Sequence, residues 1–188
     1  MNRAALRLVT PPTPDGDDDH ALVTRIGDGD LGALGALYSR YAGALLQFAD
    51  RAAPRDDAED IVQVTFLRVL AIAGRTRPEG RSARPWLYAI CTRVVFERRR
   101  ALRRLARAIA AFGREPRGTE TPHAGSRRDV TSALARLSDD KRITIVLAEI
   151  EGFTAPEIAT IVSVPVGTVW TRLHHARREL RALLEDPR

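Results

Sequence analysis

Residues 151–184 read EGFTAPEIATIVSVPVGTVWTRLHHARRELRALL, and this stretch decides how the whole chain is interpreted. It predicts two helices joined by a tight turn. Thr154 and Glu157 have the spacing of a capping box for the first helix. Pro165 follows that helix and cannot continue it. A second helix is expected to begin near Val166.

The second of these helices has an apolar side and a polar side. Its apolar residues recur at steps of three and four, as on a helix face that packs on a core; they are Val166, Val169, Leu173, Ala176, Leu180 and Leu183. The opposite face carries Thr168, Thr171, His174, His175 and Arg178, with Arg172 and Arg177 on its flanks. This pattern fits a DNA-reading helix-turn-helix, and an ordinary helical hairpin with a solvated basic face is the alternative.

The composition of the 188 residues describes a globular protein with a basic surface. Hydrophobic residues make up 44% of the chain, which is enough to form a core. The net charge of +6 favours a polyanionic partner, and almost all of the positive charge is arginine because Lys141 is the only lysine. Cys91 is the only cysteine, which excludes a disulfide framework and a cysteine-based metal cluster. No apolar run is long enough to span a membrane, so we expect a cytoplasmic protein.

Helical periodicity also fills the upstream half of the chain, and no strand pattern occurs. Residues 1–20 are rich in Pro and Asp and are predicted to form a mobile tail, although the acidic run could also cap the first helix. Asp30 is a good N-cap after a break at 27–30. We therefore predict an all-α protein with two small helical domains. The first covers 21–107, a flexible linker covers 108–128, and a four-helix helix-turn-helix domain covers 129–186.

The helix expected at 57–74, DAEDIVQVTFLRVLAIAG, is apolar around nearly its whole circumference. Few polar side chains interrupt it, chiefly Gln63, Thr65 and Arg68. A helix of this kind in so small a domain must bury more than one face. Either it is the central helix of a bundle, or one of its sides meets a partner protein.

A long arginine-rich helix is expected to begin at Pro85. Its predicted buried stripe consists of Trp86, Leu87, Ile90, Val94, Leu102 and Leu105. Its charged residues are Arg93, Arg98, Arg99, Arg100, Arg103, Arg104 and Arg107, against Glu97 alone. Such a run is usually a solvated face, but the arginines repel one another and a phosphate chain would relieve that repulsion. Trp86 and Tyr88 beside it are either structural or a stacking platform for single-stranded nucleic acid.

The order of these elements resembles the bacterial sigma factors of the extracytoplasmic-function (ECF) class, over roughly 22–107 and 129–184. The family's polymerase-clamp helix is similar to AEDIVQVTFLRVL (58–70), which implies polymerase contacts from Asp60, Gln63, Thr65, Phe66 and Leu67. The helix that melts and reads the −10 element is similar to RPWLYAICTRVVFERRR (84–100), which implies DNA contacts from Trp86, Tyr88, Arg93, Glu97, Arg98 and Arg100. The −35-reading helix-turn-helix is similar to residues 152–180, with PVGTV (165–169) as the most characteristic run.

This resemblance implies a promoter-specificity subunit of RNA polymerase, without catalysis, cofactor or metal of its own. Its implied partners are core RNA polymerase at the clamp and flap, promoter DNA, and an anti-sigma factor. The implied base readers at −35 are Thr168, Thr171, His174 and His175, and the implied phosphate clamps are Arg172, Arg177 and Arg178.

Four residues depart from the family pattern, and these departures concern which promoter is read. Arg93 and Glu97 stand where Asn and Asp are frequent, and His175 stands where Arg is frequent. Trp170 replaces a basic residue and lies beside the core stripe, where it could simply pack. Two other classes stay open on the residues alone. A stand-alone helix-turn-helix regulator requires a dimer interface or effector pocket in the first half, and an enzyme such as a recombinase requires catalytic or metal-ligating residues there.

Overall fold

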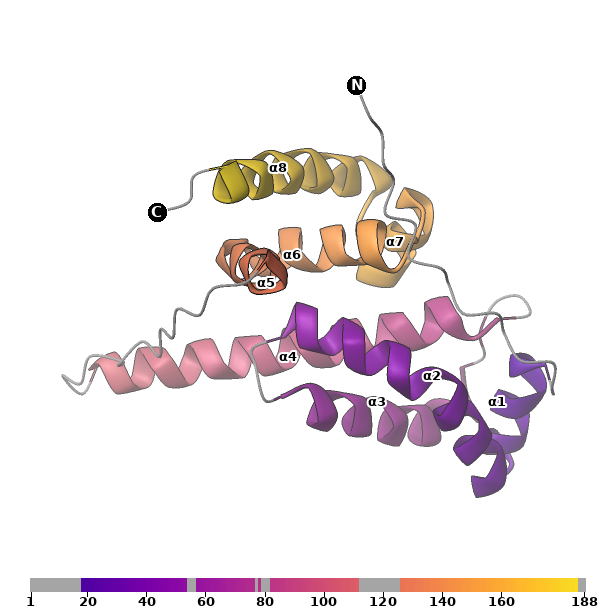
Figure 1. Cartoon of the computed structure of the whole chain (residues 1–188). Helices are drawn as coiled ribbons and strands as arrows, with labels where there is room; N and C mark the ends of the chain where they lie inside the picture. Colours follow the sequence, from indigo (N-terminus) through magenta and orange to yellow (C-terminus); the bar gives the residue numbers. More distant parts are fainter. Residues whose placement is uncertain (1–17, 54–56, 77, 79–81, 112–125, 186–188) are drawn as a thin grey trace.

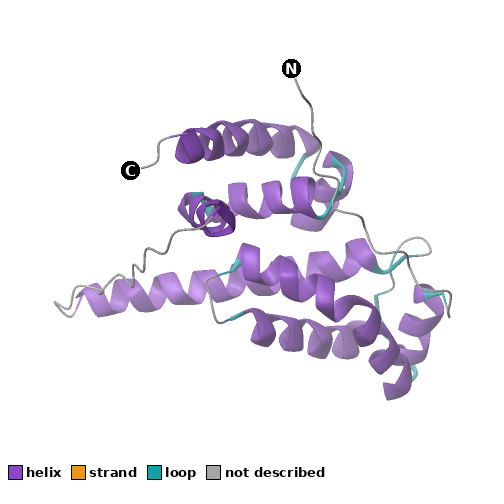
Figure 2. Ribbon diagram, in the orientation of Figure 1, coloured by secondary structure: helices purple, strands orange, loops and turns teal. Residues whose placement is uncertain are grey.

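The described part of the chain is built from helices alone (Figure 2). The structure is a computed structural model that describes residues 18–53, 57–76, 78, 82–111 and 126–185. Within these ranges no strand occurs, which confirms the predicted all-α class. The elements are α1 (Asp19–Gly27), α2 (Leu31–Ala52), α3 (Ala58–Ile72), α4 (Arg84–Ala111), α5 (Ser126–Arg136), α6 (Asp139–Ile145), the π-helical turn η1 (Val146–Ile150), α7 (Ala155–Val162) and α8 (Val166–Glu185).

The helices form two helical domains that lie against each other (Figure 1). In the first, α3 packs against both α2 and α4, and α1 packs across the end of α2. In the second, α8 packs on α6 and α7. α4 continues to Ala111 and α5 begins at Ser126, so both helices extend into the predicted linker at 108–128. Residues 112–125, and residues 1–17 of the predicted tail, lie outside the described residues.

The break between α1 and α2 forms as its sequence predicts. The Asp30 carboxylate accepts hydrogen bonds from the backbone N–H of Gly32 at 2.8 Å and of Ala33 at 3.1 Å, which confirms it as the N-cap of α2. Gly29 has φ +92°, a backbone conformation that favours glycine. α1 begins at Asp19 with Asp18 as its N-cap, so the acidic run does cap the first helix.

The ends of α1 and α3 meet at two glycines. A Cβ atom on Gly27 would lie 2.9 Å from the Cα atom of Gly74 and 3.1 Å from the backbone carbon of Ala73. Because backbone atoms cannot move aside as a flexible side chain can, this crossing requires the missing side chain at Gly27.

Replacing Gly27 by Ala is therefore expected to destabilise the protein by roughly 1–3 kcal/mol, the usual cost of overpacking. Gly35→Ala is the matched control, because nothing lies within 4 Å of the Cβ position at this mid-helix glycine. That change should stabilise the protein by about 0.5–1 kcal/mol through helix propensity. Urea unfolding of both variants measures the difference, and equal midpoints would contradict the close approach.

α3 uses its circumference in two ways. Ile61, Val62, Phe66 and Val69 are buried against the neighbouring helices. On the outer side three large apolar side chains are exposed, namely Val64, Leu67 and Leu70. α3 therefore buries one side in the bundle and leaves a second apolar side without cover from the described residues. A partner protein on that second side stays a prediction.

α4 is buried over its first half only. Leu87, Ile90 and Val94 lie in the core, as predicted. The predicted continuation of the buried stripe through Leu102 and Leu105 is wrong, because every residue from 101 to 111 is exposed. In Figure 1 this end of α4 projects beyond the other helices, so none of the described helices covers its apolar side chains.

The helix-turn-helix forms at the predicted residues. The Glu157 carboxylate accepts hydrogen bonds from the Thr154 backbone N–H and hydroxyl, both at 2.7 Å, which completes the capping box of α7. Ser163 ends α7 in the left-handed conformation, with φ 55°. In α8 the stripe of Val169, Leu173 and Ala176 is buried, and Leu180 and Leu183 pack on the core. Val166 is exposed, contrary to the prediction, because it lies in the first turn of α8 before the helix meets its neighbours.

Candidate polymerase and nucleic-acid interfaces

An apolar patch lies on the outer side of the first domain. We define the α3 patch as Val64, Leu67 and Leu70 of α3 together with Tyr38 of α2, all of them exposed. Leu67 stands at its centre and is 64% exposed. The Tyr38 ring rests on the buried Phe66 ring, with centroids 4.9 Å apart, so the patch has a firm aromatic support.

The predicted polymerase-binding residues divide between the surface and the interior. Asp60, Gln63 and Leu67 are exposed beside one another on α3. Thr65 is completely buried, and its hydroxyl donates to the backbone oxygen of Ile61 at 2.7 Å. Phe66 is also buried. Thr65 and Phe66 follow the buried residues Ile61 and Val62 by four positions, so they lie on the side of α3 that faces the neighbouring helices. The expected direct contact of Thr65 and Phe66 with polymerase is therefore not met in this conformation.

Charged residues connect the predicted polymerase helix to the predicted DNA helix. Arg98 of α4 donates to Asp57 at 2.9 Å and to Asp60 at 3.2 Å. Glu97 of α4 accepts from Arg68 of α3 at 3.0 Å, and this bond is the main reason that the pKa of Glu97 is lowered. Both pairs are exposed, so each contributes little to stability, but they orient the surfaces of α3 and α4.

The predicted −10 residues lie on different sides of α4. Arg93, Glu97, Arg98 and Arg100 are exposed, whereas Trp86 is half-buried and Tyr88 is completely buried. The Tyr88 ring packs between Phe48 and Phe153, and its hydroxyl donates to Glu151 of the second domain. Burial raises the pKa of Tyr88. Trp86 and Tyr88 therefore do not form the predicted stacking platform in this conformation.

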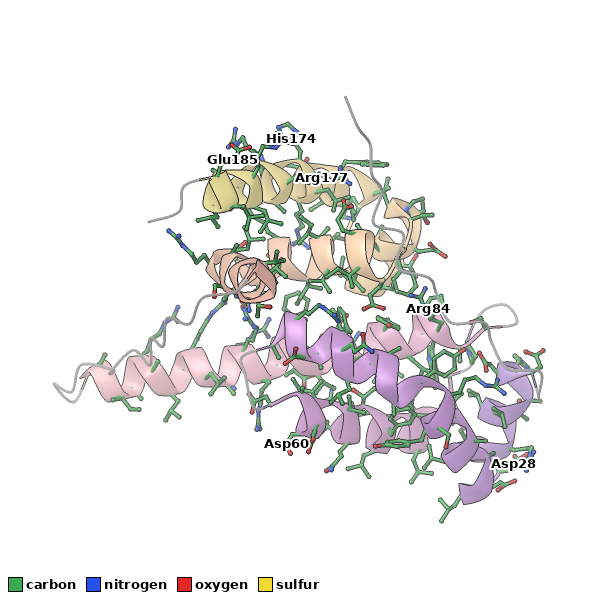
Figure 3. The ribbon with its side chains drawn as sticks, in the orientation of Figure 1. Asp28, Asp60, Arg84, His174, Arg177 and Glu185 are labelled. Carbon is green, nitrogen blue, oxygen red and sulfur yellow. The ribbon has the colours of Figure 1, made fainter. Side chains whose placement is uncertain are left out.

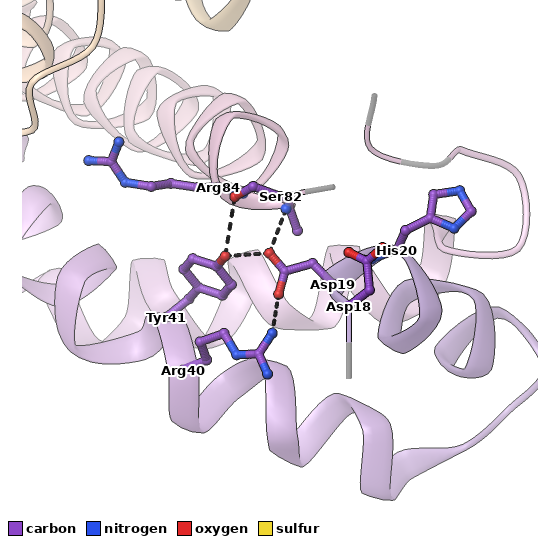
Figure 4. Close-up of polar contacts among 8 residues, drawn as sticks. Asp18, Asp19, His20, Arg40, Tyr41, Ser82 and Arg84 are labelled. Carbon is purple, nitrogen blue, oxygen red and sulfur yellow. Dashed lines mark hydrogen bonds and ion pairs between the residues drawn. The ribbon is translucent and has the colours of Figure 1, made fainter. Parts of the chain in front are cut away.

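A buried carboxylate that no sequence motif indicated fixes the start of α4 (Figure 4). Asp19 is only 3% exposed and accepts hydrogen bonds from Arg40, from the Tyr41 hydroxyl, and from the Ala83 backbone N–H at 2.7 Å. Burial and the bond to Asp19 raise the pKa of Tyr41 to about 12. Asp19 belongs to an acidic run that reads as a tail, so only its position just before an amphipathic helix could have indicated a structural role.

The predicted −35 face of α8 is open, and part of it is engaged in ion pairs. Thr171, His174, Arg177 and Arg178 are exposed, and Thr168, Arg172 and His175 are half-buried. His174 points away from the other helices (Figure 3). Arg177 pairs with Glu149 at 2.6 Å and Arg172 with Asp140 at 3.3 Å, whereas Arg178 forms no ion pair with the described residues.

Trp170 is 57% exposed on this side of the molecule. Trp170 therefore does not pack beside the core stripe, although its position in the sequence allowed this. An exposed indole next to the turn of the helix-turn-helix is a large stacking and hydrogen-bonding group on the predicted DNA face. Among the helices that the structure describes, none combines the length and the apolarity that a membrane span requires.

Comparison with known proteins agrees with this geometry. Residues 37–107 match the family model of Sigma-70 region 2, and residues 127–180 match that of Sigma-70, region 4. The ECF RNA polymerase sigma factor SigL of Mycobacterium tuberculosis is 30% identical over 171 residues, which cover 88% of this chain and 97% of SigL.

Two solved structures share both the fold and the sequence similarity. CnrH, solved in complex with the cytosolic domain of CnrY, has a TM-score of 0.65 and 30% identity, covering 90% of this chain and 98% of CnrH. The sigma factor RpoE of Bartonella quintana, solved with the anti-sigma factor NepR, has a TM-score of 0.63 and 28% identity, covering 78% and 92%.

The fold and the two region matches define an RNA polymerase sigma factor. The chain belongs to the ECF family of these factors, as its sequence motifs indicate. It is an alternative sigma factor that directs transcription initiation.

Proposed function

We propose that the chain binds core RNA polymerase at the clamp through the α3 patch and has no catalytic step of its own. The observation that carries this proposal is the exposure of Val64, Leu67 and Leu70 on a helix whose opposite side is a buried core. Contiguous exposed apolar side chains on a folded protein mark a site for a partner. Asp60 and Gln63 supply a polar rim, and Phe66 supports the patch through its ring contact with Tyr38, whereas Thr65 is buried in the core.

For promoter opening, we propose that α4 holds the non-template strand near the −10 element. Arg93 and Arg100 are exposed and would contact phosphates. Glu97 and Arg98 would first have to leave their α3 partners. Trp86 and Tyr88 would support strand separation only after the second domain moves away from Tyr88.

At the −35 element, we propose that α8 enters the major groove and that the second domain also meets the polymerase flap. Thr171 and His174 are the exposed candidates for base reading, with Thr168 and His175 beside them. Arg172, Arg177 and Arg178 would contact the phosphates that flank the groove. Trp170 joins this face as a departure from the family pattern, so it is a candidate for this member's own promoter preference.

The arginines of α8 differ in what they lose on binding DNA. Arg178 has no ion-pair partner in the described residues, whereas Arg177 must leave Glu149. Arg178→Ala is therefore expected to weaken all promoters similarly and to lower the salt slope of binding by about one. Arg177→Ala should weaken DNA binding less, because Arg177 must break its ion pair with Glu149 before it can contact a phosphate. Fluorescence anisotropy over a salt series measures both slopes, and a change of sequence preference in Arg178→Ala would contradict its role as a phosphate clamp.

We further propose cytoplasmic action and control by an anti-sigma factor. The solved complex of RpoE with the anti-sigma factor NepR supports a partner of this kind, and the α3 patch is the apolar surface that such a partner could cover. The proposed domain limits remain 21–107 and 129–186. A stand-alone DNA-binding regulator is not favoured, because it would leave the α3 patch without a partner.

Run-off transcription tests the proposed function. Purified core polymerase and the full chain would be incubated with a library of promoter fragments, with core polymerase alone as the control. We expect transcripts of defined start site only when the chain is present. Absence of promoter-dependent initiation by the purified chain would contradict its action as a sigma factor, and transcripts made without core polymerase would contradict the absence of catalysis.

A further inference from the structure

One side of α4 faces the second domain. The side chains that make this contact are Arg84, Tyr88, Arg99 and Arg103. They follow one another at steps of four, eleven and four residues, which places them within about 100° of the helix circumference. This side is distinct from the exposed side that carries Arg93 and Arg100.

At the start of α4 the contact centres on Glu151. The Arg84 guanidinium donates to the Glu151 backbone oxygen at 2.5 Å and lies 3.6 Å from its carboxylate. It also stacks over the Phe153 ring, 4.1 Å from the centroid. Tyr88 donates its hydroxyl to the same carboxylate. Figure 3 shows Arg84 between α4 and the second domain.

Farther along α4 the contact centres on Asp139, the first residue of α6. Asp139 is 7% exposed, and its carboxylate binds both Arg99 and Arg103. Burial is the main reason that the pKa of Arg99 is lowered to about 10, and the positive charge of the nearby Arg142 is the next. The Nε atom of Arg99 has no acceptor within the described residues. One carboxylate therefore faces two guanidinium groups, and paired guanidinium groups of this kind bind phosphate oxygens as well as carboxylates.

The same packing keeps the two proposed DNA-reading helices close together. α8 packs on α7 and α7 packs on α4. With about 8–10 Å between the axes of packed helices, α8 lies only about 20 Å from α4. The centres of the −10 and −35 elements, 25 base pairs apart, are separated by about 85 Å of B-form DNA at about 3.4 Å per base pair. This conformation cannot reach both elements at once.

We infer that the free chain is closed by its own acidic residues, with Asp139 seated in a phosphate-binding site that Arg99 and Arg103 form on α4. Glu151 holds the other end of the contact. When the domains separate, the DNA backbone takes the place of Asp139, so nucleic acid and the second domain compete for the same two arginines. The role of this site at a promoter rests on the proposed function, whereas closure and anion binding do not.

Asp139→Asn tests the competition directly. The neutral amide keeps the shape of the side chain but releases the two arginines, so the full-length variant should bind DNA more tightly. The probe is a fluorescein-labelled duplex of 20 base pairs with an unrelated sequence, followed by anisotropy over a salt series. Asp50→Asn is the matched control, because Asp50 is exposed on α2 and the change in net charge is the same. We expect about tenfold tighter binding than the control and a salt slope steeper by about two, one for each arginine.

Two further variants show whether the gain arises at this site. Adding Arg103→Ala to Asp139→Asn should remove most of the gain. Arg103→Ala alone should loosen the closed form without tighter DNA binding, and it is informative even if Asp139→Asn fails to fold, because Arg103 is largely exposed. Arg107→Ala, one turn farther along the exposed end of α4, removes the same charge without a contact to Asp139, so it is the control and should leave the closed form intact.

Small-angle X-ray scattering of the same proteins measures closure. The wild type should be compact at low salt, and Asp139→Asn and Arg103→Ala should have a larger radius of gyration than their controls. A wild type that is already extended, or a compact Asp139→Asn with the affinity of Asp50→Asn, would overturn the inference. Opening of Asp139→Asn without tighter DNA binding would overturn the phosphate site, because this variant keeps both arginines. Failure of run-off transcription alongside the expected scattering and anisotropy would overturn the proposed function only.

Discussion

Leu67→Asp should abolish promoter-dependent transcription while leaving the protein folded. Leu67 is the most exposed member of the α3 patch, and a carboxylate there would be desolvated against the apolar surface of a partner. Truncation of a central interface residue commonly costs 2 kcal/mol or more, so we expect at least about 30-fold weaker binding to core polymerase. The stability of the free chain should change by less than about 1 kcal/mol, because the side chain has little to lose on the folded surface.

Leu105→Asp is the control for this prediction. Leu105 has a similar exposure, but it lies on the projecting end of α4 and outside the α3 patch. Its binding to core polymerase should be unchanged. Titration of labelled core polymerase measures the affinities, and circular dichroism with urea unfolding verifies the folds. Equal loss of binding in both variants would show that any new surface carboxylate interferes, and the α3 patch would then have no special role.

Asp19→Ala should lower the free energy of unfolding by about 3 kcal/mol. The change removes the acceptor for Arg40, for the Tyr41 hydroxyl and for the backbone N–H that begins α4. Loss of one partner from a buried ionic network is costly, because the remaining polar groups keep their desolvation penalty. The expected effect is therefore much larger than that of an ordinary surface substitution.

Asp28→Ala provides the comparison for Asp19. Asp28 is an exposed aspartate at the other end of α1, and its change should alter stability by no more than about 0.5 kcal/mol. Urea unfolding monitored by circular dichroism gives both values. If the two variants had the same midpoint, the network around Asp19 would not stabilise the start of α4.

Local sequence patterns were sufficient for most of the fold. Caps at Asp30 and Thr154, the break at Pro165 and the period of the α8 stripe each depend on residues a few positions apart, and the structure confirms them. Errors occurred where the outcome depends on distant neighbours. Leu102 and Leu105 have the spacing of a buried stripe, but none of the helices that the structure describes lies over them. Periodicity gives the direction of a side chain along its own helix and not the presence of a partner.

The candidate site was predictable to the level of the helix and less well to the level of the residue. Motif resemblance selected α3, α4 and α8 as a whole, and Asp60, Gln63, Leu67 and His174 do reach the surface. Thr65, Phe66 and Tyr88 lie inside, because residues that recur in a motif can recur for packing. Contacts between Asp139 and the arginines of α4 join residues about 40 positions apart, and no local pattern indicates them.

The two apolar sides of α3 also bear on how much change this helix can accept. A surface helix usually has an outer face on which substitutions are nearly free, and this freedom lets its sequence drift. α3 has little such freedom. Substitution of the buried residues Ile61 or Val69 lowers stability, and substitution of the exposed residues Leu67 or Leu70 removes part of the proposed binding surface. In a scan of all single substitutions, thermal stability and transcription should therefore divide α3 into complementary halves, with hardly a position tolerant in both assays.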